Sequence, residues 1–415
     1  MRATLVRCLR RSLLAAPLIP ASCGAPWDAP DELVVTEWTA TQDLRIGSVD
    51  DPDYSLTFFR TMEVGPNGTM YTVHPQEQLV RVFAPDGSIR TTIGGRGDGP
   101  GEFQNVVTIG WVADTLWLLD GNGYRFSQFT ADGKFLGSFS VPFVAGSDPR
   151  AIQPPRAGGM LFDGTIHGSP PAFSSQVAEG TLTHHVPMLM TREGVVTDTL
   201  PAIPFGRNQW AVTNPDAPQR GGLYMHQPFA DGPLWEFASS EAALVILTRT
   251  AASSLDEAVF VISKVSFDGD TLFSRGYRYV PVPTRLEVMD SILDDVGERL
   301  GERGLFGATA AQVRGWAALS LYQPPFEPPV RAMILGRDGT IWLDRGAGEI
   351  DGMNHWLVLD ADGRPFAGLD LPARLTVLKV VPPYLWASEN DESDVPYLVR
   401  FRVAESRPRT RQLPL

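Results

Sequence analysis

The chain has 415 residues, of which 43% are hydrophobic, so it can bury a sizeable core in one large domain or several smaller ones. Its formal net charge of −13 excludes a general nucleic-acid-binding surface, because contacts with phosphates require an excess of lysine and arginine. The 40 glycines and 35 prolines are spread along the chain, which indicates many turns and argues against a disordered low-complexity tract.

Residues 1–23 have the features of a signal peptide. An arginine-rich start precedes an apolar run at 12–21, and this run is too short to span a bilayer as a helix. The run ends at Ala21-Ser22-Cys23, which resembles the lipobox of bacterial lipoproteins, with Pro20 where that family usually has leucine. The resemblance implies that Cys23 carries a lipid and starts the mature chain, with residues 24–32 as a tether.

The two cysteines agree with this interpretation. Cys8 would leave with the signal peptide, so the mature chain would hold Cys23 alone and could form no internal disulfide. No later run is long and apolar enough for a transmembrane helix. We therefore expect an exported lipoprotein, facing the periplasm or the cell exterior and attached to the membrane only through its lipid.

Residues 33–405 repeat a unit of four short β-runs joined by tight turns. The first unit is the clearest, with strands expected at 61–64, 69–73, 79–83 and 88–93. Asn67-Gly68 and Asp86-Gly87 supply the positive φ that tight turns need. Four antiparallel strands per unit are typical of a propeller blade. Further units start near residues 107, 159, 234, 330 and 375.

The repeat predicts an all-β fold, a six-bladed β-propeller over residues 33–405, followed by a tail at 406–415. The sixth unit lacks its fourth strand, and the segment 33–46 could supply it and close the ring. Asp338-Gly339-Thr340-Ile341-Trp342, Val80-Arg81-Val82-Phe83 and the run at 93–103 resemble the NHL-repeat-like six-bladed propellers of exported bacterial proteins. That resemblance implies a binding or scaffolding module, or, in a minority of members, a lyase or hydrolase with metal in the central channel.

The long irregular segments all fall on one face of the expected propeller, where function commonly lies on loops held by a rigid scaffold. They are 94–103, 169–183, 207–233, 281–329 and 346–354. The segment 281–329 is expected to be a helical insertion between blades four and five, beginning with a capping box at Thr284 and Glu287. We expect its apolar face to pack on the propeller and partly cover the channel mouth.

Polar residues recur at the end of the second strand of each unit, where they would surround the channel mouth. Such a ring could bind a cation or polar ligand or perform acid–base chemistry, although strand ends are also polar because their side chains cap loops. The candidates are His74, Asp120, Ser169, Arg249, Asp344, Arg345 and Glu389.

The insert at 207–233 holds a second group of candidates, Arg207, Tyr224 and His226. Arginine beside aromatic residues suits sugar, peptide or carboxylate ligands. His74, His167 and His226 come from separate segments, so a divalent metal is possible, although no recognised histidine spacing supports one.

The sequence therefore favours an exported propeller that binds a small molecule, a glycan or a protein partner on its loop-rich face. A channel-mouth lyase or hydrolase, possibly metal-dependent, and a structural scaffold of the cell envelope are the alternatives.

Overall fold

The computed structural model is built mostly of strands, with two α-helices in the part of the chain that it describes. The described part is residues 32–414 without 57, 60, 113, 122–124, 141–160, 163–164, 169–183, 186–187, 191–195, 205, 208, 218–221, 239–240, 305–306 and 347–351. Cys23, most of the expected tether and Ser169 lie outside it. Within the described part no helix has the length and hydropathy to cross a membrane.

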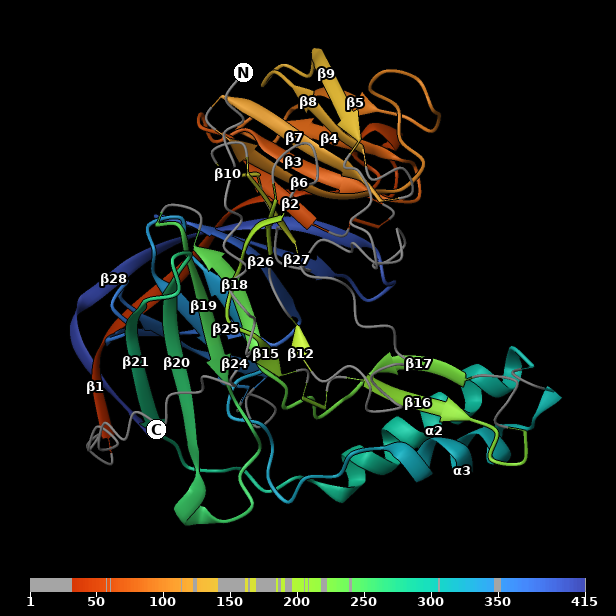
Figure 1. The fold of residues 1–415 in the computed structure, drawn as a ribbon, viewed down its shortest axis with the longest axis vertical. Coiled ribbons are helices and arrows are strands. Elements are labelled where there is room, and N and C mark those ends of the chain that lie inside the picture. The colour runs from red at the N-terminus through yellow and green to blue at the C-terminus, as the bar shows by residue number, and fades with distance from the viewer. Residues whose placement is uncertain are drawn as a thin grey trace, which may run out of the picture.

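Most sheets repeat one plan, in which consecutive strands pair antiparallel (Figure 1). The first is β2 (Thr61–Val64), β3 (Met70–His74), β4 (Leu79–Phe83) and β5 (Ile89–Gly94). The second is β6 (Val106–Val112), β7 (Thr115–Asp120), β8 (Arg125–Phe129) and β9 (Phe135–Ser140). A later one is β18 (Leu234–Ala238), β19 (Ala243–Thr248), β20 (Val259–Ser266) and β21 (Thr271–Arg278).

A further sheet between these has shorter strands. It comprises β10 (Leu161–Phe162), β11 (Thr165–Gly168), β13 (Met188–Met190) and β14 (Val196–Thr199). A separate pair joins β12 (His184–His185), which comes before β13 in the chain, to β15 (Ile203–Pro204), which comes after β14. The predicted turns between third and fourth strands are confirmed, because Gly87 and Gly363 have φ of 88° and 77°.

The last sheet has eight strands because the two ends of the chain meet in it. Its order is β22 (Ala332–Leu335), β23 (Ile341–Asp344), β24 (Met353–Leu359), β25 (Pro365–Pro372), β1 (Glu32–Ile46), β28 (Pro396–Pro414), β27 (Tyr384–Asn390) and β26 (Leu375–Val381). β1 pairs antiparallel with β28 and touches β25 in parallel at Thr36 and Glu37. The prediction that the N-terminal segment supplies the missing strand is confirmed.

The same pairing corrects the expected tail. Residues 406–414 continue β28, and Pro414 pairs with Glu32 at the start of β1. The expected tail is therefore part of a strand, because β1 is long enough to pair with these residues as well.

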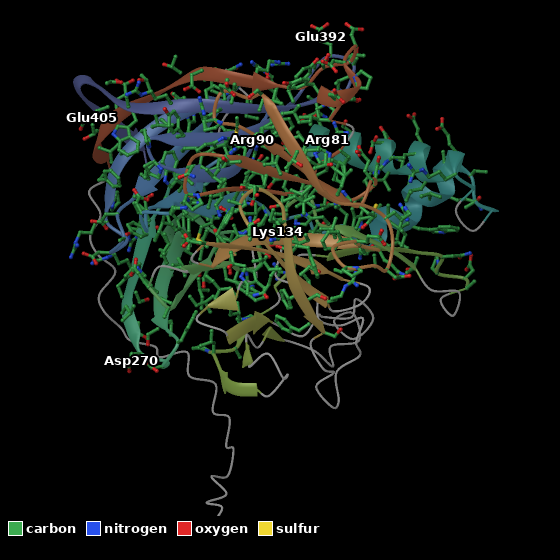
Figure 2. All side chains as sticks on the ribbon, turned by 90° about the horizontal axis from the view of Figure 1, so that it is seen from above. Arg81, Arg90, Lys134, Asp270, Glu392 and Glu405 are labelled. Carbon is green, nitrogen blue, oxygen red and sulfur yellow. The ribbon has the colours of Figure 1, made fainter. Side chains whose placement is uncertain are left out.

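The first strands of the sheets contact one another in the order β18, β22, β26, β2, β6 and β10. The inner strands of neighbouring blades in a β-propeller follow one another in the same way. Apolar side chains fill the space between neighbouring sheets, and Trp342 packs with Val380 of β26 and Leu385 of β27. The charged side chains of Asp270, Glu392 and Glu405 lie at the edge of the molecule (Figure 2).

The two long insertions pack on each other instead of on the sheets. One forms the hairpin of β16 (Gln209–Thr213) and β17 (Gly222–His226), and the other forms α2 (Leu286–Glu302) and α3 (Ala310–Ser320). We call this unit the hairpin–helix module, and it projects to the lower right in Figure 1. The predicted packing of the helices over the channel mouth is therefore wrong, because their apolar face is covered by the hairpin.

The helix starts differ from each other. The predicted capping box at Thr284 and Glu287 does not form, since α2 begins after Arg285 without a side-chain cap. At α3, Thr309 and Gln312 cap each other reciprocally.

Trp38→Ala tests whether β1 holds the eight-stranded sheet together. The Trp38 ring lies edge-on to Phe366 with centroids 5.2 Å apart and contacts Trp342 at 5.8 Å, so its loss removes packing between β1 and the β22–β25 strands. We expect the free energy of unfolding in urea to fall by about 2–4 kcal/mol. The control, Leu272→Ala on an exposed side chain, should change it by less than about 0.5 kcal/mol. Equal effects of the two substitutions would contradict a closing role for β1.

Candidate functional site

The described candidates of the predicted ring do stand at or near the ends of second strands, and the side chains of five of them make contacts within the fold: His74, Asp120, Arg249, Asp344 and Glu389. Asp120 ends β7 and is buried. Its carboxylate accepts hydrogen bonds from the backbone N–H groups of Gln104 (3.0 Å) and Asn105 (3.1 Å), and Arg125 lies 3.5 Å away. This is the loop-capping role that polar strand ends often have.

His74 is completely buried at the end of β3. Its Nε2 lies 2.8 Å from the hydroxyl of Thr72, and the Phe59 ring packs near the imidazole. Burial, with the charge of Arg81 as a second cause, lowers the pKa of His74 to about 4. The imidazole is therefore neutral at physiological pH and is not presented to a ligand.

Asp344 ends β23, and Arg345 follows it. The Asp344 carboxylate accepts from the backbone N–H of Gly346 (2.9 Å) and from the amide of Asn354 (3.3 Å), and burial raises its pKa. Burial lowers the pKa of the Arg345 guanidinium to about 10, which still leaves it charged at neutral pH.

Arg249 and Glu389 connect neighbouring strands. The buried Arg249 donates to the carbonyl oxygens of Gly232 (2.8 Å) and Val330 (2.6 Å), which precede β18 and β22. Glu389 lies between Arg45 of β1 and the Nε of Arg374 (2.5 Å). Both side chains thus hold neighbouring elements together at the positions where the sequence suggested a ligand site.

The candidates in the 207–233 insert lie in or beside the hairpin–helix module. The Arg207 guanidinium stacks 4.2 Å over the Tyr322 ring and lies 3.2 Å from Asp231. Tyr224 pairs through its backbone with Ala211 in the β16–β17 hairpin. His226 ends β17 and lines a cleft of about 450 Å³ between that hairpin and α2.

Asp231, which sequence reasoning missed, holds the neck of the module. Its buried carboxylate accepts from Arg207, from the Tyr322 hydroxyl (3.1 Å) and from the backbone N–H of Ala251 (3.4 Å). It therefore joins the ends of both insertions to the β18–β21 sheet. No local pattern marks this aspartate, because its partners come from three distant segments.

A cluster of opposite charges lies on and beside the first strands, and sequence reasoning also missed it. Glu63 of β2 accepts from Lys379 of β26 (2.8 Å) and from Arg337, which follows β22 (3.0 Å). Glu236 of β18 accepts from the backbone N–H of Leu335 (2.9 Å). These side chains come from the first strands, or from just beyond the first strands, of three sheets, and we call them the axial cluster.

Glu236 is the titratable member of the axial cluster. Burial raises its pKa to about 7; Lys379 acts against the rise and Glu63 adds to it. A carboxyl group that titrates near neutral pH can donate or accept a proton, which makes Glu236 a candidate acid–base group.

Neither set of residues forms a recognisable metal site. Among the described residues, no three histidine, cysteine, aspartate or glutamate side chains lie together as ligands would. The side chain of His167, which the sequence suggested with His74 and His226, lies outside the described residues.

No protein-family model and no curated protein sequence matches the chain. Among solved structures it is similar to a DUF4221 family member from Bacteroides vulgatus, with 12% identity over 89% of this chain and 99% of that chain and a TM-score of 0.46. It is also similar to a catalytically inactive virginiamycin B lyase from Staphylococcus aureus with quinupristin, with 10% identity, coverage of 88% and 99% and a TM-score of 0.42. A third similar structure is the PQQ-bound aldose sugar dehydrogenase of Streptomyces coelicolor, with 10% identity over 90% of this chain and 100% of that chain and a TM-score of 0.43. With identities of 10% to 12% and TM-scores of 0.42 to 0.46, these similarities do not assign a function to this chain.

Glu236→Gln tests the titration of the axial cluster. Between pH 4.5 and 7 the Glu236 carboxyl keeps its proton in the folded chain but has lost it in the unfolded chain. The contribution of Glu236 to the free energy of unfolding therefore falls as the pH rises from 4.5 to 7, and it is constant above pH 7. We expect the unfolding free energy of the variant, relative to the natural chain, to rise by about 1–3 kcal/mol from pH 5 to pH 7.5 in urea titrations.

The comparison between the two proteins is needed because His74 has the opposite effect. Its lowered pKa makes both proteins less stable as the pH falls below about 6.5, and this contribution cancels in the difference. A difference that stays constant from pH 5 to pH 7.5 would show that Glu236 is ionised throughout.

Proposed function

We propose that this chain is an exported six-bladed β-propeller of the NHL-repeat-like kind that binds a protein partner through the hairpin–helix module. The order of the six first strands supports six blades, and in such a ring the sheet that begins at β10 would adjoin the sheet that begins at β18. Binding is favoured over catalysis at the channel mouth because five ring candidates are held in contacts that stabilise the fold, namely His74, Asp120, Arg249, Asp344 and Glu389.

The observation that carries this proposal is the construction of the module. Two insertions that are distant in sequence share one core, in which Trp210 and Val212 of the hairpin pack with Leu293, Val296 and Val313 of the helices. The Trp210 indole also donates to the carbonyl of Ala317 (2.9 Å). Such a unit is not needed to complete any of the sheets, and long insertions on a rigid scaffold commonly carry function.

The module and its neck expose apolar side chains to solvent. Val280 and Val282 precede α2, Leu286 starts it, and Leu319 lies near the end of α3, with exposures of 45% to 74%. α2 and α3 pack together, and Pro283 bridges Phe326 where the insertion returns to the sheets. Leu286 and Leu319 therefore lie at the same end of the helix pair, as expected for a surface that a protein partner covers.

The charge of α2 indicates the chemistry of the partner. The helix has six acidic side chains and one arginine. Arg314 of α3 binds Asp290 (3.0 Å) and Asp294 (2.5 Å), and Arg299 pairs with Asp295 (3.3 Å). Glu287, Glu298 and Glu302 also face solvent, so the module favours a partner segment that combines apolar and basic side chains.

Photo-crosslinking tests this interface. A benzoylphenylalanine at Leu286 or Leu319 should give a discrete crosslinked product with a second protein when the full chain is expressed in its own cells. The same residue at Leu272, which is exposed on β21, should give none. The partner fragment, identified by mass spectrometry, should contain basic residues.

Charge reversal provides the second half of that test. Glu298→Lys with Glu302→Lys should lower the crosslink yield at least about threefold, whereas Asp270→Lys on the β20–β21 turn should leave it unchanged. Products that form equally at Leu272, or no product at any position, would contradict partner binding and favour an envelope scaffold. A glycan or small molecule bound in the module cleft would be found instead by ligand screening of these variants.

Catalysis in the channel remains a second candidate because of one observation, the pKa of Glu236 near 7 within the axial cluster. A lyase or hydrolase activity that is present in the natural chain and lost in Glu236→Gln, with stability retained, would favour this function.

Export and lipid attachment rest on the sequence of residues 1–23. Cys23→Ser should move the protein from the membrane fraction to the soluble extracytoplasmic fraction and abolish incorporation of labelled palmitate. A single lipid chain binds membranes reversibly, so retention of the full chain should reflect more than one chain on Cys23. Membrane association of the serine variant would mean that something other than Cys23 holds the protein there.

A further inference from the structure

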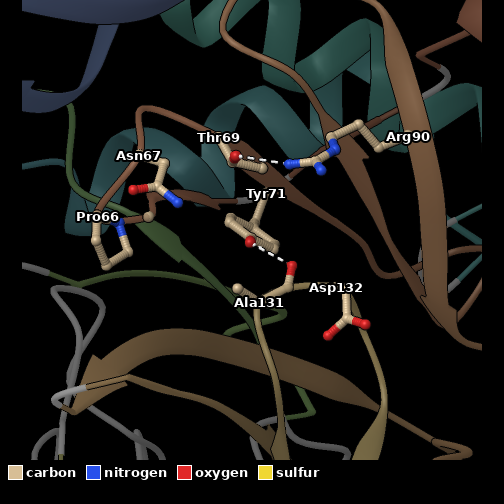
Figure 3. Close-up of a pocket in the computed structure, with 8 residues that line it drawn as sticks. Pro66, Asn67, Thr69, Tyr71, Arg90, Ala131 and Asp132 are labelled. Atoms are coloured by element: carbon tan, nitrogen blue, oxygen red, sulfur yellow. Dashed lines mark hydrogen bonds between the residues drawn. The ribbon is translucent and has the colours of Figure 1, made fainter.

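A small pocket lies between the first two sheets, on the face opposite the module. Its volume is about 180 Å³, and its walls come from the β2–β3 turn, from β3 and β5, and from the β8–β9 turn (Figure 3). In a repeat of antiparallel strands these turns emerge on one face, while the two insertions of the module follow fourth strands and emerge on the other. The pocket is therefore independent of the proposed partner-binding surface.

Tyr71 of β3 gives the pocket a rigid wall. Its hydroxyl donates to the carbonyl of Ala131 (2.7 Å), which joins the two sheets, and its ring lies edge-on to Trp111 at 5.4 Å. Tyr71 is 1% exposed, so its ring offers no open face on which a sugar could stack.

Two side chains of opposite charge, Arg90 and Asp132, line the pocket but do not form an ion pair with each other. Figure 3 shows the Arg90 guanidinium and the Asp132 carboxylate on either side of the Tyr71 hydroxyl. Both charges act on Tyr71, and Arg90 acts on Asp132, yet no ion pair joins these two described residues. The arrangement is that of a site for a ligand that carries both signs of charge.

Both charged groups retain hydrogen-bonding capacity. Arg90 has five N–H donors, and its contact among the described residues is a long one to the Thr69 hydroxyl (3.4 Å). Asp132 accepts from the Thr130 hydroxyl and keeps further lone pairs. The exposed Asn67 amide adds a donor and an acceptor on the opposite wall.

We propose that this pocket binds a free α-amino acid with a small side chain, with its carboxylate on Arg90 and its ammonium group near Asp132. The volume equals that of about six water molecules, which suits a ligand the size of alanine, serine or threonine. A peptide cannot satisfy both charges here, because its terminal groups are separated by at least one further residue.

Calorimetric titration of the chain from residue 24 with glycine, alanine, serine and threonine at low ionic strength tests the site. A ligand this small is expected to bind with a dissociation constant on the order of 0.01–1 mM. N-acetylalanine and alanine amide each lack one charge and should bind at least about tenfold more weakly than alanine.

Arg90→Gln and Asp132→Asn should each weaken the binding of alanine at least about tenfold. Neither substitution should change the melting temperature, because both side chains are exposed. Lys134→Gln is the matched control, since Lys134 lies beside Asp132 in sequence but does not line the pocket, and it should change affinity less than about twofold. No binding at 10 mM ligand, equal binding of N-acetylalanine, or equal binding by Arg90→Gln would overturn the proposal.

Discussion

The pairing of β1 with β28 is the constraint on which the rest of the structure depends. Strands from the two ends of the chain pair from Ile46 and Leu398 to Glu32 and Pro414, and this covers an edge of β28 that would otherwise be open. β1 also touches β25, so the last eight strands form one sheet. Because closure between chain ends costs entropy, a long register with many hydrogen bonds is needed to hold it.

With the sheets held in this order, the first strands of successive sheets lie in contact and bring charged side chains close to one another. Glu63 is neutralised by Lys379 and Arg337, and Glu236 receives a hydrogen bond from Leu335. Polar side chains at the ends of the second strands are used in a similar way, as Asp120 and Arg249 show. A buried polar group that lacks a partner is costly, so most of these contacts are requirements of the fold.

The antiparallel plan then separates two kinds of surface. Short turns on one face leave room for the pocket beside Tyr71, where Arg90 and Asp132 stand apart. The long connections that follow the fourth strands produce the module, and Asp231 fixes its neck to the β18–β21 sheet. The proposed small-ligand site and the proposed partner-binding surface therefore lie on different faces of the fold.

Local patterns in the sequence determined the strands, the tight turns and the need for an added strand in the last unit. Asp86-Gly87 and the alternation around it depend on neighbouring residues, so they can be read without knowing the fold, and the same holds for the Thr309 cap of α3. The sequence also marked the two insertions, and it placed Asp120 and Asp344 at strand ends.

The tertiary structure alone decided what those residues contact. Trp210 and Val296 share a core although one belongs to a hairpin and the other to a distant helix, and Lys379 meets Glu63 across 316 positions. The extension of β28 past residue 405, the role of Asp231 and the pocket between Arg90 and Asp132 also depend on segments that no local pattern connects. The physical reason is that strand and turn formation follow from interactions between near neighbours, whereas the partner of a charged or apolar side chain depends on which sheets become adjacent.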